Sequence, residues 1–401
     1  MKKNIEEQLK IIKKGSCEVL VEKELIEKLK ENRPLAIKFG FDPTAPDIHI
    51  GHAICMIKLK ELQNMGHNIF FLIGDFTAKI GDPTGKKETR KNILKEEIRK
   101  NINNCLPQIF KILDRKKTTI IENGSWLDNL NLEKMIELTS KHTVARMLER
   151  KDFAERYQKK NSIAIHEFIY PIIQGYDSIK IRADIEIGGT DQKFNLLMGR
   201  EMQKQNGYSP QTIITMPLLI GTDGKKKMSK SYRNYIKISE NPEIIFRKIM
   251  SISDELMWHY YKSFDIEIDK EIDKVKKINS KNILFRDAKT KLAKEIVCKL
   301  YGENEACKAH NLFLQNIYKK DTIQKRIVEK KLLMTQESLP LFYVLKKLSL
   351  VNSTSEAIRL IHQGAVKIDQ KTVKDPKKVV FKGSRHVYSI GKHMTLRIIL
   401  N

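Results

Sequence analysis

Cysteine is scarce in this sequence of 401 residues, and nothing in its placement suggests pairing. The five cysteines are scattered, odd in number and never spaced as Cys-x-x-Cys. This pattern supports neither a disulfide framework nor a zinc ribbon, and it is typical of a protein in the reducing cytoplasm. Long hydrophobic runs are also missing, since none is longer than the run at residues 69–73, which is far shorter than the roughly 20 residues that span a membrane. Acidic residues precede any apolar segment at the N-terminus, so we expect a cytoplasmic protein with no secretory signal and no membrane partner.

Negative charge is in short supply. The chain has 49 Asp and Glu against 75 Lys and Arg, which gives a net charge of +26. Such an excess favours a polyanionic partner, although a solvated, lysine-rich surface would produce the same balance. The length and the 41% hydrophobic content allow two or three domains, each with a core of its own.

Apolar runs alternate with helical patterns over the first 235 residues. Strand-like segments occupy 35–41, 68–74, 118–122, 184–188 and 211–215. Helical periodicity occupies 3–31, 51–64, 91–113, 131–149, 165–181 and 191–205. This alternation predicts an α/β fold with a doubly wound parallel, Rossmann-like sheet.

The pattern changes twice in the remainder of the chain. Strand signals fade after about residue 240, and Lys/Glu/Ile/Leu helical patterns predict an all-α domain. The tail has two short helical patterns followed by alternating strands, which predict a small α+β domain. From Lys331 onward this tail carries 13 basic and 4 acidic residues. We therefore expect domains at 1–235, 236–335 and 336–401.

The sharpest local pattern is Pro-Thr-Ala-Pro-Asp-Ile-His-Ile-Gly-His, at residues 43–52 between the first strand and the next helix. His49 and His52 lie at a helix N-terminus, and Gly51 between them allows a ligand to approach closely. Free backbone N–H groups and the helix dipole favour phosphate oxygens there. A metal pair is the competing interpretation, but nothing nearby supplies a third ligand or the Glu of an His-Glu-x-x-His motif.

A second pattern is the glycine-led loop Gly-Lys-Lys-Lys-Met-Ser-Lys-Ser at residues 224–231, which carries several ammonium groups. Taken alone it could be a solvated run of charge. His-Ile-Gly-His followed by Lys-Met-Ser-Lys-Ser, however, resembles the paired signatures of class I aminoacyl-tRNA synthetases. The order of the two motifs therefore favours a site for ATP.

Polar residues also gather on one face of the predicted helix 165–181. Tyr170, Gln174 and Asp177 fall at i, i+4 and i+7 of an otherwise apolar helix, so they share a face. A satisfied core network is the alternative to a polar ligand. Residues 80–86 and 188–192 are expected at strand carboxyl ends, where open α/β sheets bind ligands. The segment 81–86 is one residue short of a Walker A loop and lacks its Ser or Thr, which excludes a P-loop.

Four segments together resemble the tyrosyl-tRNA synthetase family over essentially the whole chain: 38–44, 81–85, 170–177 and 189–192. The tail at 353–368 is similar to the alpha-L RNA-binding domain that bacterial members carry. Asp177 and this tail argue against the tryptophanyl relatives, and the intact His and Lys motifs argue against a non-catalytic RNA-binding paralogue. Lys38 stands where better-known members have a Tyr that contacts the phenol. The chain is thus similar to a second bacterial subgroup, and the role of Lys38 stays open.

The resemblance implies an enzyme that activates tyrosine with ATP and transfers it from tyrosyl-adenylate to the 3′ end of tRNA(Tyr), releasing pyrophosphate in the first step. It also implies a homodimer, and Mg²⁺ that accompanies ATP without a tightly bound protein metal. The implied catalytic residues are Thr44, His49, His52, Lys86, Arg90, Lys227 and Lys230. The implied ATP-binding motifs add Pro43, Gly51, Asp191, Met228, Ser229 and Ser231. The implied tyrosine site comprises Asp42, Asp82, Tyr170, Gln174, Asp177 and Gln192, and the tail offers Arg359, Lys367 and Arg385 to RNA phosphates.

Overall fold

The structure is a computed structural model that describes residues 4–84, 93–268, 283–325, 328–391 and 394–401. The chain divides into two compact units, Met1–Asn311 and Leu312–Asn401. No helix among these residues is long and apolar enough to cross a lipid bilayer.

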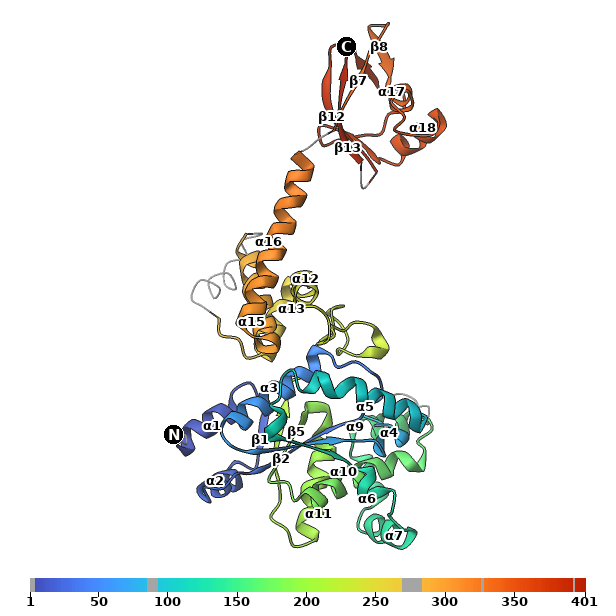
Figure 1. Ribbon diagram of the computed structural model, residues 1–401. Helices are drawn as coiled ribbons and strands as arrows, with labels where there is room; N and C mark the ends of the chain where they lie inside the picture. The colour runs from blue at the N-terminus through green and yellow to red at the C-terminus, as the bar shows by residue number, and fades with distance from the viewer. Residues whose placement is uncertain (1–3, 85–92, 269–282, 326–327, 392–393) are drawn as a thin grey trace. The chain divides into compact units, whose positions relative to one another are not determined.

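A six-stranded sheet in the order β1-β6-β5-β2-β3-β4 forms the centre of the first unit (Figure 1). Five of its strands run parallel: β2 (Ala36–Phe41), β3 (Asn68–Ile73), β4 (Thr118–Glu122), β5 (Ile185–Gly189) and β6 (Thr212–Met216). The chain builds β2, β3 and β4 outward in one direction and then returns to place β5 and β6 on the other side of β2. The predicted doubly wound parallel sheet is therefore confirmed, and its topological switch point lies between β2 and β5.

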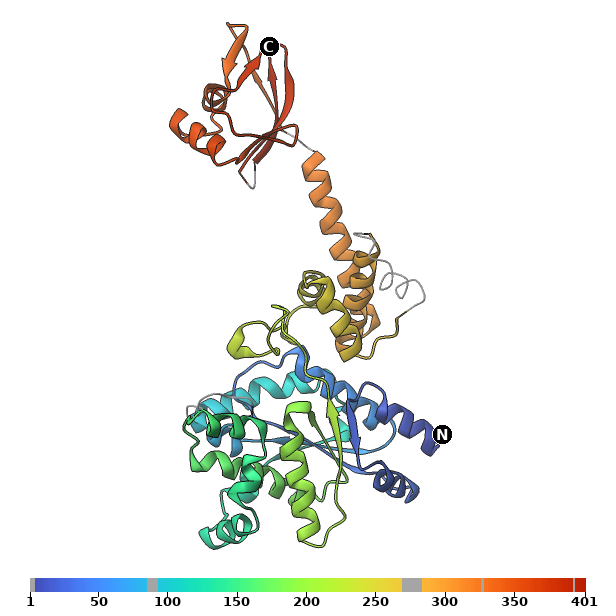
Figure 2. The ribbon, with the colours of Figure 1, turned by 180° about the vertical axis from the view of Figure 1, so that it is seen from behind.

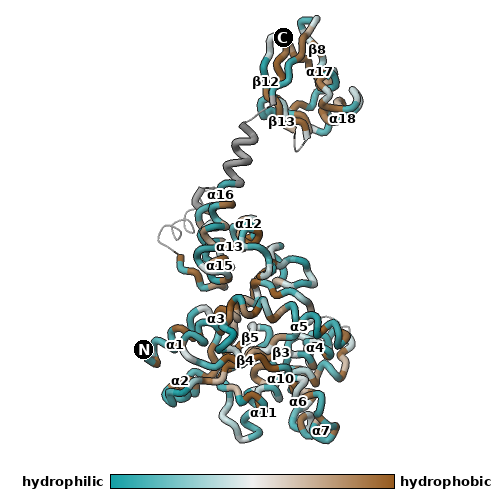
Figure 3. The backbone as a smooth tube through the Cα atoms, viewed as in Figure 1, coloured by the Kyte–Doolittle hydropathy of each residue, from teal (hydrophilic) through white to brown (hydrophobic). Residues whose placement is uncertain are grey.

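Helices cover both faces of this sheet, as the two opposite views show (Figure 2). One face carries α3 (Ile50–Asn64) and α5 (Lys95–Ile109), and the other carries α10 (Ile165–Ile181) and α11 (Lys193–Gln205). Because both faces are covered, the strands are apolar on both sides, and hydrophobic colour concentrates on them in Figure 3. Shorter helices complete this part: α4 (Thr77–Ile80), α6 (Gly124–Leu127), α7 (Leu132–Ser140), α8 (Val144–Leu148) and α9 (Lys151–Gln158).

The N-terminal segment differs from the prediction of continuous helix over 3–31. Helix α1 (Ile5–Lys13) ends before Gly15, whose φ of +70° lies in the left-handed region that favours glycine. The chain then forms the short strand β1 (Glu18–Leu20), antiparallel to β6, before α2 (Glu22–Lys30). The sheet therefore has one antiparallel edge strand, which helical periodicity could not reveal because the pairing partner lies far along the chain.

The predicted helical region after residue 240 is confirmed. It contains α12 (Pro242–Met250), α13 (Asp254–Ser263), α15 (Ile283–Tyr301) and α16 (Glu303–Lys325). Tyr301 ties the end of α15 to the segment just before α12, because its hydroxyl donates to the backbone oxygens of Ile238 and Glu240 at 2.5 and 2.8 Å.

The second unit contains a five-stranded sheet in the order β10-β9-β12-β13-β7, with helices α17 (Leu341–Lys347) and α18 (Thr354–His362) packed on its core. Its strands are β7 (Val328–Leu332), β9 (Val366–Ile368), β10 (Lys371–Val373), β12 (Arg385–Ile390) and β13 (Met394–Leu400). A separate pair joins β8 (Ser338–Pro340) and β11 (Val379–Phe381). Strand β7 pairs with β13 although it precedes residue 336, so the sheet of this unit begins before the expected boundary.

Candidate active site

A cavity of about 320 Å³ opens at the carboxyl ends of β2 and β5, at the switch point of the sheet. The cavity is lined by β2, by the N-terminus of α3, by β5 and the beginning of α11, by one face of α10, and by the loop 227–231. The predicted site residues that line it are Asp42, Thr44, His49, Gly51, His52, Asp82, Tyr170, Gln174, Asp177, Asp191, Gln192, Lys227, Met228, Ser229, Lys230 and Ser231.

Of the three remaining predicted residues of this site, the structure describes one and leaves two undescribed. Pro43 is not among the lining residues; its carbonyl accepts a hydrogen bond of 3.0 Å from the Asn101 side chain of α5, which anchors the loop that carries Thr44. Lys86 and Arg90 lie outside the described residues.

His49 and His52 stack on each other at the start of α3, with ring centroids 3.7 Å apart. A Cβ at position 51 would lie 2.9 Å from Nδ1 of His49, so the motif requires glycine there. Burial, assisted by the charges of Lys230 and Lys227, lowers the pKa of His49 to about 3. Burial also holds the pKa of His52 well below its usual range, with His49 adding to the effect. Both rings are therefore neutral near pH 7 and can bind phosphate oxygens as hydrogen-bond donors rather than as cations.

One nitrogen atom of this pair lacks a hydrogen-bond partner in the part of the chain that the structure describes. Nδ1 of His49 is buried and has no hydrogen-bond partner among the described residues. A buried nitrogen left in this state is costly, and an incoming polar group would satisfy it. In the same described part of the chain, no group of three or more His, Cys, Asp or Glu side chains is arranged to hold a metal ion.

The loop 224–231 is held against the cavity by backbone hydrogen bonds. The N–H of Met228 donates to the Leu219 carbonyl at 2.7 Å. The Lys227 ammonium lies 2.9 Å from Oδ2 of Asp191, and the Lys230 ammonium donates to the Ala45 carbonyl at 3.3 Å. Burial lowers the pKa of Lys230. The loop thus brings two ammonium groups to the histidine side of the cavity.

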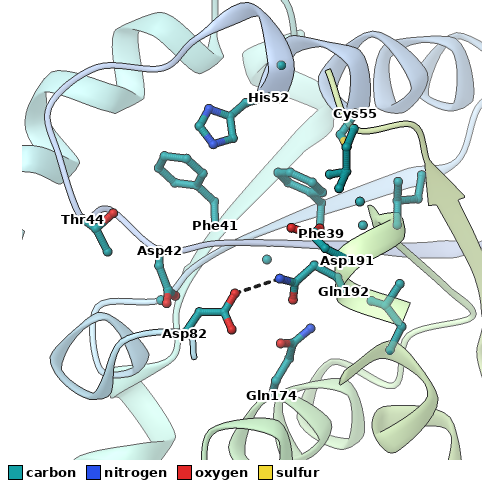
Figure 4. Close-up of a pocket in the computed structure, with 18 of the residues that line it drawn as sticks. Phe39, Phe41, Asp42, Thr44, His52, Cys55, Asp82, Gln174, Asp191 and Gln192 are labelled. Atoms are coloured by element: carbon teal, nitrogen blue, oxygen red, sulfur yellow. Dashed lines mark hydrogen bonds between the residues drawn. The ribbon is translucent and has the colours of Figure 1, made fainter. Parts of the chain in front are cut away.

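Carboxylates occupy the opposite wall of the cavity (Figure 4). Asp42 accepts hydrogen bonds from the Tyr170 hydroxyl at 2.8 Å and the Thr77 hydroxyl at 2.7 Å. Asp82 accepts one of 2.8 Å from the Gln192 amide, drawn as the dashed line in Figure 4. A cavity wall with two carboxylates beside neutral amides suits a ligand that carries an ammonium group.

Asp177 lies buried on α10 at the inner part of the cavity. It accepts hydrogen bonds from the Trp126 indole at 2.9 Å and the Asn123 amide at 3.2 Å. Burial raises its pKa to about 7, against the opposing field of Lys38. The sequence prediction missed Asn123 and Trp126, although both follow the predicted strand 118–122 at the sheet edge where ligands bind.

The three residues proposed for RNA lie exposed in the second unit, on α18, β9 and β12. Arg385 differs from the other two residues because its side chain forms an ion pair. Its guanidinium lies 2.8 Å from Glu329, which also holds Arg397 at 2.9 Å. Arg359 and Lys367 have no such ion pair among the described residues.

Comparison with known proteins identifies the architecture. A family model described as class I tRNA synthetases (W and Y) matches residues 30–318, and one described as the S4 domain matches residues 339–385. The chain belongs to the class I tryptophanyl and tyrosyl tRNA synthetase family. The S4 match also confirms the expectation of an RNA-binding domain in the tail of this synthetase.

Curated relatives of this class I synthetase match it from end to end. A protein of Francisella tularensis named tyrosine-tRNA ligase is 52% identical over 397 residues, which cover 99% of each chain. One of Photobacterium profundum with the same name is 50% identical over 399 residues, again 99% of each chain.

Solved structures share the fold of this synthetase. The tyrosyl-tRNA synthetase of Archaeoglobus fulgidus, solved in complex with L-tyrosine, is 24% identical with a TM-score of 0.60; the match covers 77% of this chain and all of that one. A truncated mitochondrial tyrosyl-tRNA synthetase of Aspergillus nidulans is 21% identical with a TM-score of 0.62, covering 78% of this chain and 94% of its own.

Proposed function

We propose that this synthetase is a tyrosine-tRNA ligase, which activates tyrosine with ATP to tyrosyl-adenylate and transfers tyrosine to the 3′ end of tRNA(Tyr). The choice of tyrosine as the amino acid rests on Asp177. This buried carboxylate lines the cavity and accepts hydrogen bonds from the Trp126 indole and the Asn123 amide. A buried acceptor of this kind suits a phenol hydroxyl and would be left without its partner beside a phenylalanine ring. The names of the curated relatives support the same activity.

In this proposal the carboxylate wall holds the amino acid. Asp82, Tyr170 and Gln174 bind the ammonium group, and Asp42 supports Tyr170 through the hydrogen bond between them. Gln192 lies on the carboxylate side of the amino acid, and Asp177 accepts a hydrogen bond from the phenol hydroxyl.

The histidine wall then holds ATP. Thr44, His49 and His52 face the triphosphate, with Pro43 and Gly51 shaping their loop, and Asp191 faces the ribose. Lys227 and Lys230 bind the departing pyrophosphate, together with Lys86 and Arg90. Met228, Ser229 and Ser231 position these ammonium groups.

The reaction needs no covalent nucleophile on the protein. The carboxylate of tyrosine attacks the α-phosphorus of ATP, and pyrophosphate leaves. The protein contributes positioning and neutralises charge that grows on the phosphoryl group and on pyrophosphate. Mg²⁺ bound to the triphosphate oxygens would supply further positive charge beside Lys227 and Lys230.

We extend the proposal to assembly and location. Five large hydrophobic side chains are exposed on α7–α10, with exposed fractions from 58% to 79%: Leu132, Ile136, Val144, Tyr157 and Ile165. Such a surface suits a symmetric contact with a second copy of the chain. We also propose that the homodimer acts in the cytoplasm. Residues 1–235 would catalyse the reaction, and residues 236–335 would face the anticodon side of the tRNA. Residues 336–401 would bind RNA through Arg359, Lys367 and Arg385.

The decisive experiment is ATP–pyrophosphate exchange by the full chain with single amino acids. Tyrosine should support exchange, whereas tryptophan and phenylalanine should support almost none. Exchange that depends on tryptophan would instead assign the tryptophanyl activity. The absence of exchange with all three amino acids, in a folded preparation that still binds tRNA, would point to a non-catalytic RNA-binding protein.

A further inference from the structure

A positive charge is buried directly behind the amino-acid end of the cavity. Lys38 on β2 lies opposite Glu186 on β5 in the strand register, and its side chain is completely buried. Glu186 lines the cavity, but Lys38 does not. Lys38 therefore reaches any ligand only through its neighbours.

All three protons of the Lys38 ammonium have acceptors. Its nitrogen lies 2.8 Å from Oε1 of Glu186, 2.9 Å from the carbonyl of Gln174 and 2.7 Å from the hydroxyl of Ser178. The last two belong to α10. A single ammonium group thus ties the two central strands to the helix that carries the phenol-facing residue.

Glu186 completes the cluster from the other side. Its Oε2 accepts hydrogen bonds from the hydroxyl of Ser178 at 2.8 Å and from the amide of Gln211, and its Oε1 accepts one of 3.4 Å from the Gln174 amide. A buried ion pair is no more stabilising than well-packed apolar side chains of similar size. Stability alone therefore gives no reason for charges here.

The pair also acts on Asp177, one turn along α10 from Gln174. The positive charge of Lys38 lowers the pKa of Asp177 and the negative charge of Glu186 raises it, while burial raises it most. Asn123 and Trp126, which hydrogen-bond to Asp177 from the loop after β4, also lower that pKa. The ionisation of Asp177 thus depends on two charged groups of opposite sign on neighbouring strands.

We propose that Lys38 and Glu186 form a positioning pair that holds α10 and orients Gln174 and Asp177 for an amino acid whose ring carries a hydroxyl group. Lys38 is a specificity-determining residue that touches no substrate. This inference rests on the proposed function and adds to it the device that selects tyrosine over phenylalanine.

The first test replaces Lys38 with methionine, which keeps the length of the side chain and removes its charge. The readout is exchange with tyrosine and with phenylalanine, each at varied amino acid and varied ATP. Lys38→Met should raise the KM for tyrosine and lower the tyrosine-to-phenylalanine ratio of kcat/KM, each by about tenfold or more, because a buried carboxylate loses its partner. The KM for ATP should change little, since the histidine wall is untouched.

Lys28 offers a matched control. It is also buried, with 4% of its surface exposed, and donates to the carbonyls of Asp184 and Pro210 at 2.9 and 2.7 Å, away from the cavity. Lys28→Met should leave the tyrosine-to-phenylalanine ratio at the wild-type value. A fall in this ratio equal to that of Lys38→Met would mean that loss of any buried lysine perturbs the site, and would overturn the proposal.

Glu186→Gln provides a second test that does not depend on the folding of Lys38→Met. In the pH profile of the wild type, kcat/KM for tyrosine should fall as the pH is lowered; this fall is the acid limb. The midpoint of the acid limb should move to lower pH in Glu186→Gln and to higher pH in Lys38→Met. The double variant Lys38→Met/Glu186→Gln should recover part of the selectivity lost in Lys38→Met, because no uncompensated charge remains.

ATP–pyrophosphate exchange by the wild-type protein distinguishes a failure of the proposed function from a failure of the positioning role of Lys38 and Glu186. If the wild type fails to use tyrosine, the proposed function fails. If the wild type uses tyrosine and Glu186→Gln keeps both its acid limb and its selectivity, the positioning role is overturned, whether or not Lys38→Met folds.

Discussion

At the scale of single residues, burial shifts the pKa of three side chains of the cavity. It lowers the pKa of His49 and of His52, which keeps both rings neutral near pH 7, and it raises the pKa of Asp177 to about 7. In the proposed function, the histidine motif therefore contributes hydrogen-bond donors, and the lysines supply the positive charge for ATP. The sequence predicted that these residues lie in one site, but it gave no charge states for them, because those depend on burial.

We expect Asp177 to set the pH dependence of tyrosine use. Burial raises its pKa to about 7, so lowering the pH through this range should protonate the carboxylate, whereas the ionised form would accept a hydrogen bond from the phenol hydroxyl. We expect kcat/KM for tyrosine to fall by about tenfold per pH unit on the acid side of this limb. Asp177→Asn should abolish the limb and lower the tyrosine-to-phenylalanine ratio by about 10- to 100-fold, the range for hydrogen bonds to charged groups. Exchange rates measured from pH 5 to 8 with tyrosine and with phenylalanine check the pH profile and the selectivity. If Asp177→Asn kept the fall of kcat/KM at low pH, Asp177 would be excluded as the group that causes it.

At the scale of secondary-structure elements, the site residues lie where a strand ends, where a helix begins, and along one face of α10. Strand β2 delivers Asp42 and Thr44, α3 begins with the histidine pair, and α10 presents a polar face at helical spacing. Each of these local patterns was recognisable in the sequence, because side-chain periodicity and capping depend on residues a few positions apart. The sequence placed Asn123 and Trp126 after a strand but could not pair them with Asp177, because the folded sheet is what brings these distant segments into direct contact.

The lysine loop should act on the rate of adenylation rather than on tyrosine binding. If Lys230 stabilises pyrophosphate as it leaves, Lys230→Ala should raise the barrier by about 3 kcal/mol, as loss of one preorganised donor does. The dissociation constant for tyrosine should stay the same, because this contact forms late in the reaction. Pre-steady-state measurement of adenylate formation tests this expectation.

Lys225 provides the control within the same loop, since it is exposed and does not line the cavity. Lys225→Ala should form adenylate at nearly the wild-type rate. A Lys230→Ala variant that weakens tyrosine binding alone would contradict the proposed role.

At the scale of the whole molecule, the two units separate the chemistry from the proposed RNA contacts. None of the residues that line the cavity belongs to the unit that begins at Leu312. Because β7 is part of the second sheet, a clean truncation ends at Lys325 rather than near residue 335.

A chain that ends at Lys325 should keep tyrosine-dependent exchange and lose most tRNA charging. The salt dependence of tRNA binding should become shallower by about 0.7–0.9 per lost phosphate contact. Binding isotherms at several salt concentrations measure this slope. If the truncated chain charges tRNA as well as the full chain at moderate salt, the RNA-binding role of the tail is wrong.

The exposed hydrophobic side chains on α7–α10 give a test of the homodimer. Ile136→Asp should shift the protein from dimer towards monomer in sedimentation experiments, because an aspartate in an apolar contact loses its hydration. Leu333→Asp changes a side chain that is 80% exposed in the other unit and should leave the dimer intact. A wild-type protein that is monomeric at micromolar concentration would refute the proposed assembly.

The sequence by itself determined the alternation of strands and helices, the position of the two ATP motifs and the shared face of Tyr170, Gln174 and Asp177. These features follow from spacing along the chain, which secondary structure turns directly into geometry. Only the tertiary structure decided the antiparallel edge strand β1, the pairing of β7 with β13 and the ion pair between Lys38 and Glu186. Each of these joins segments that are distant in sequence, and the charge states of the site follow from burial, which no local pattern specifies.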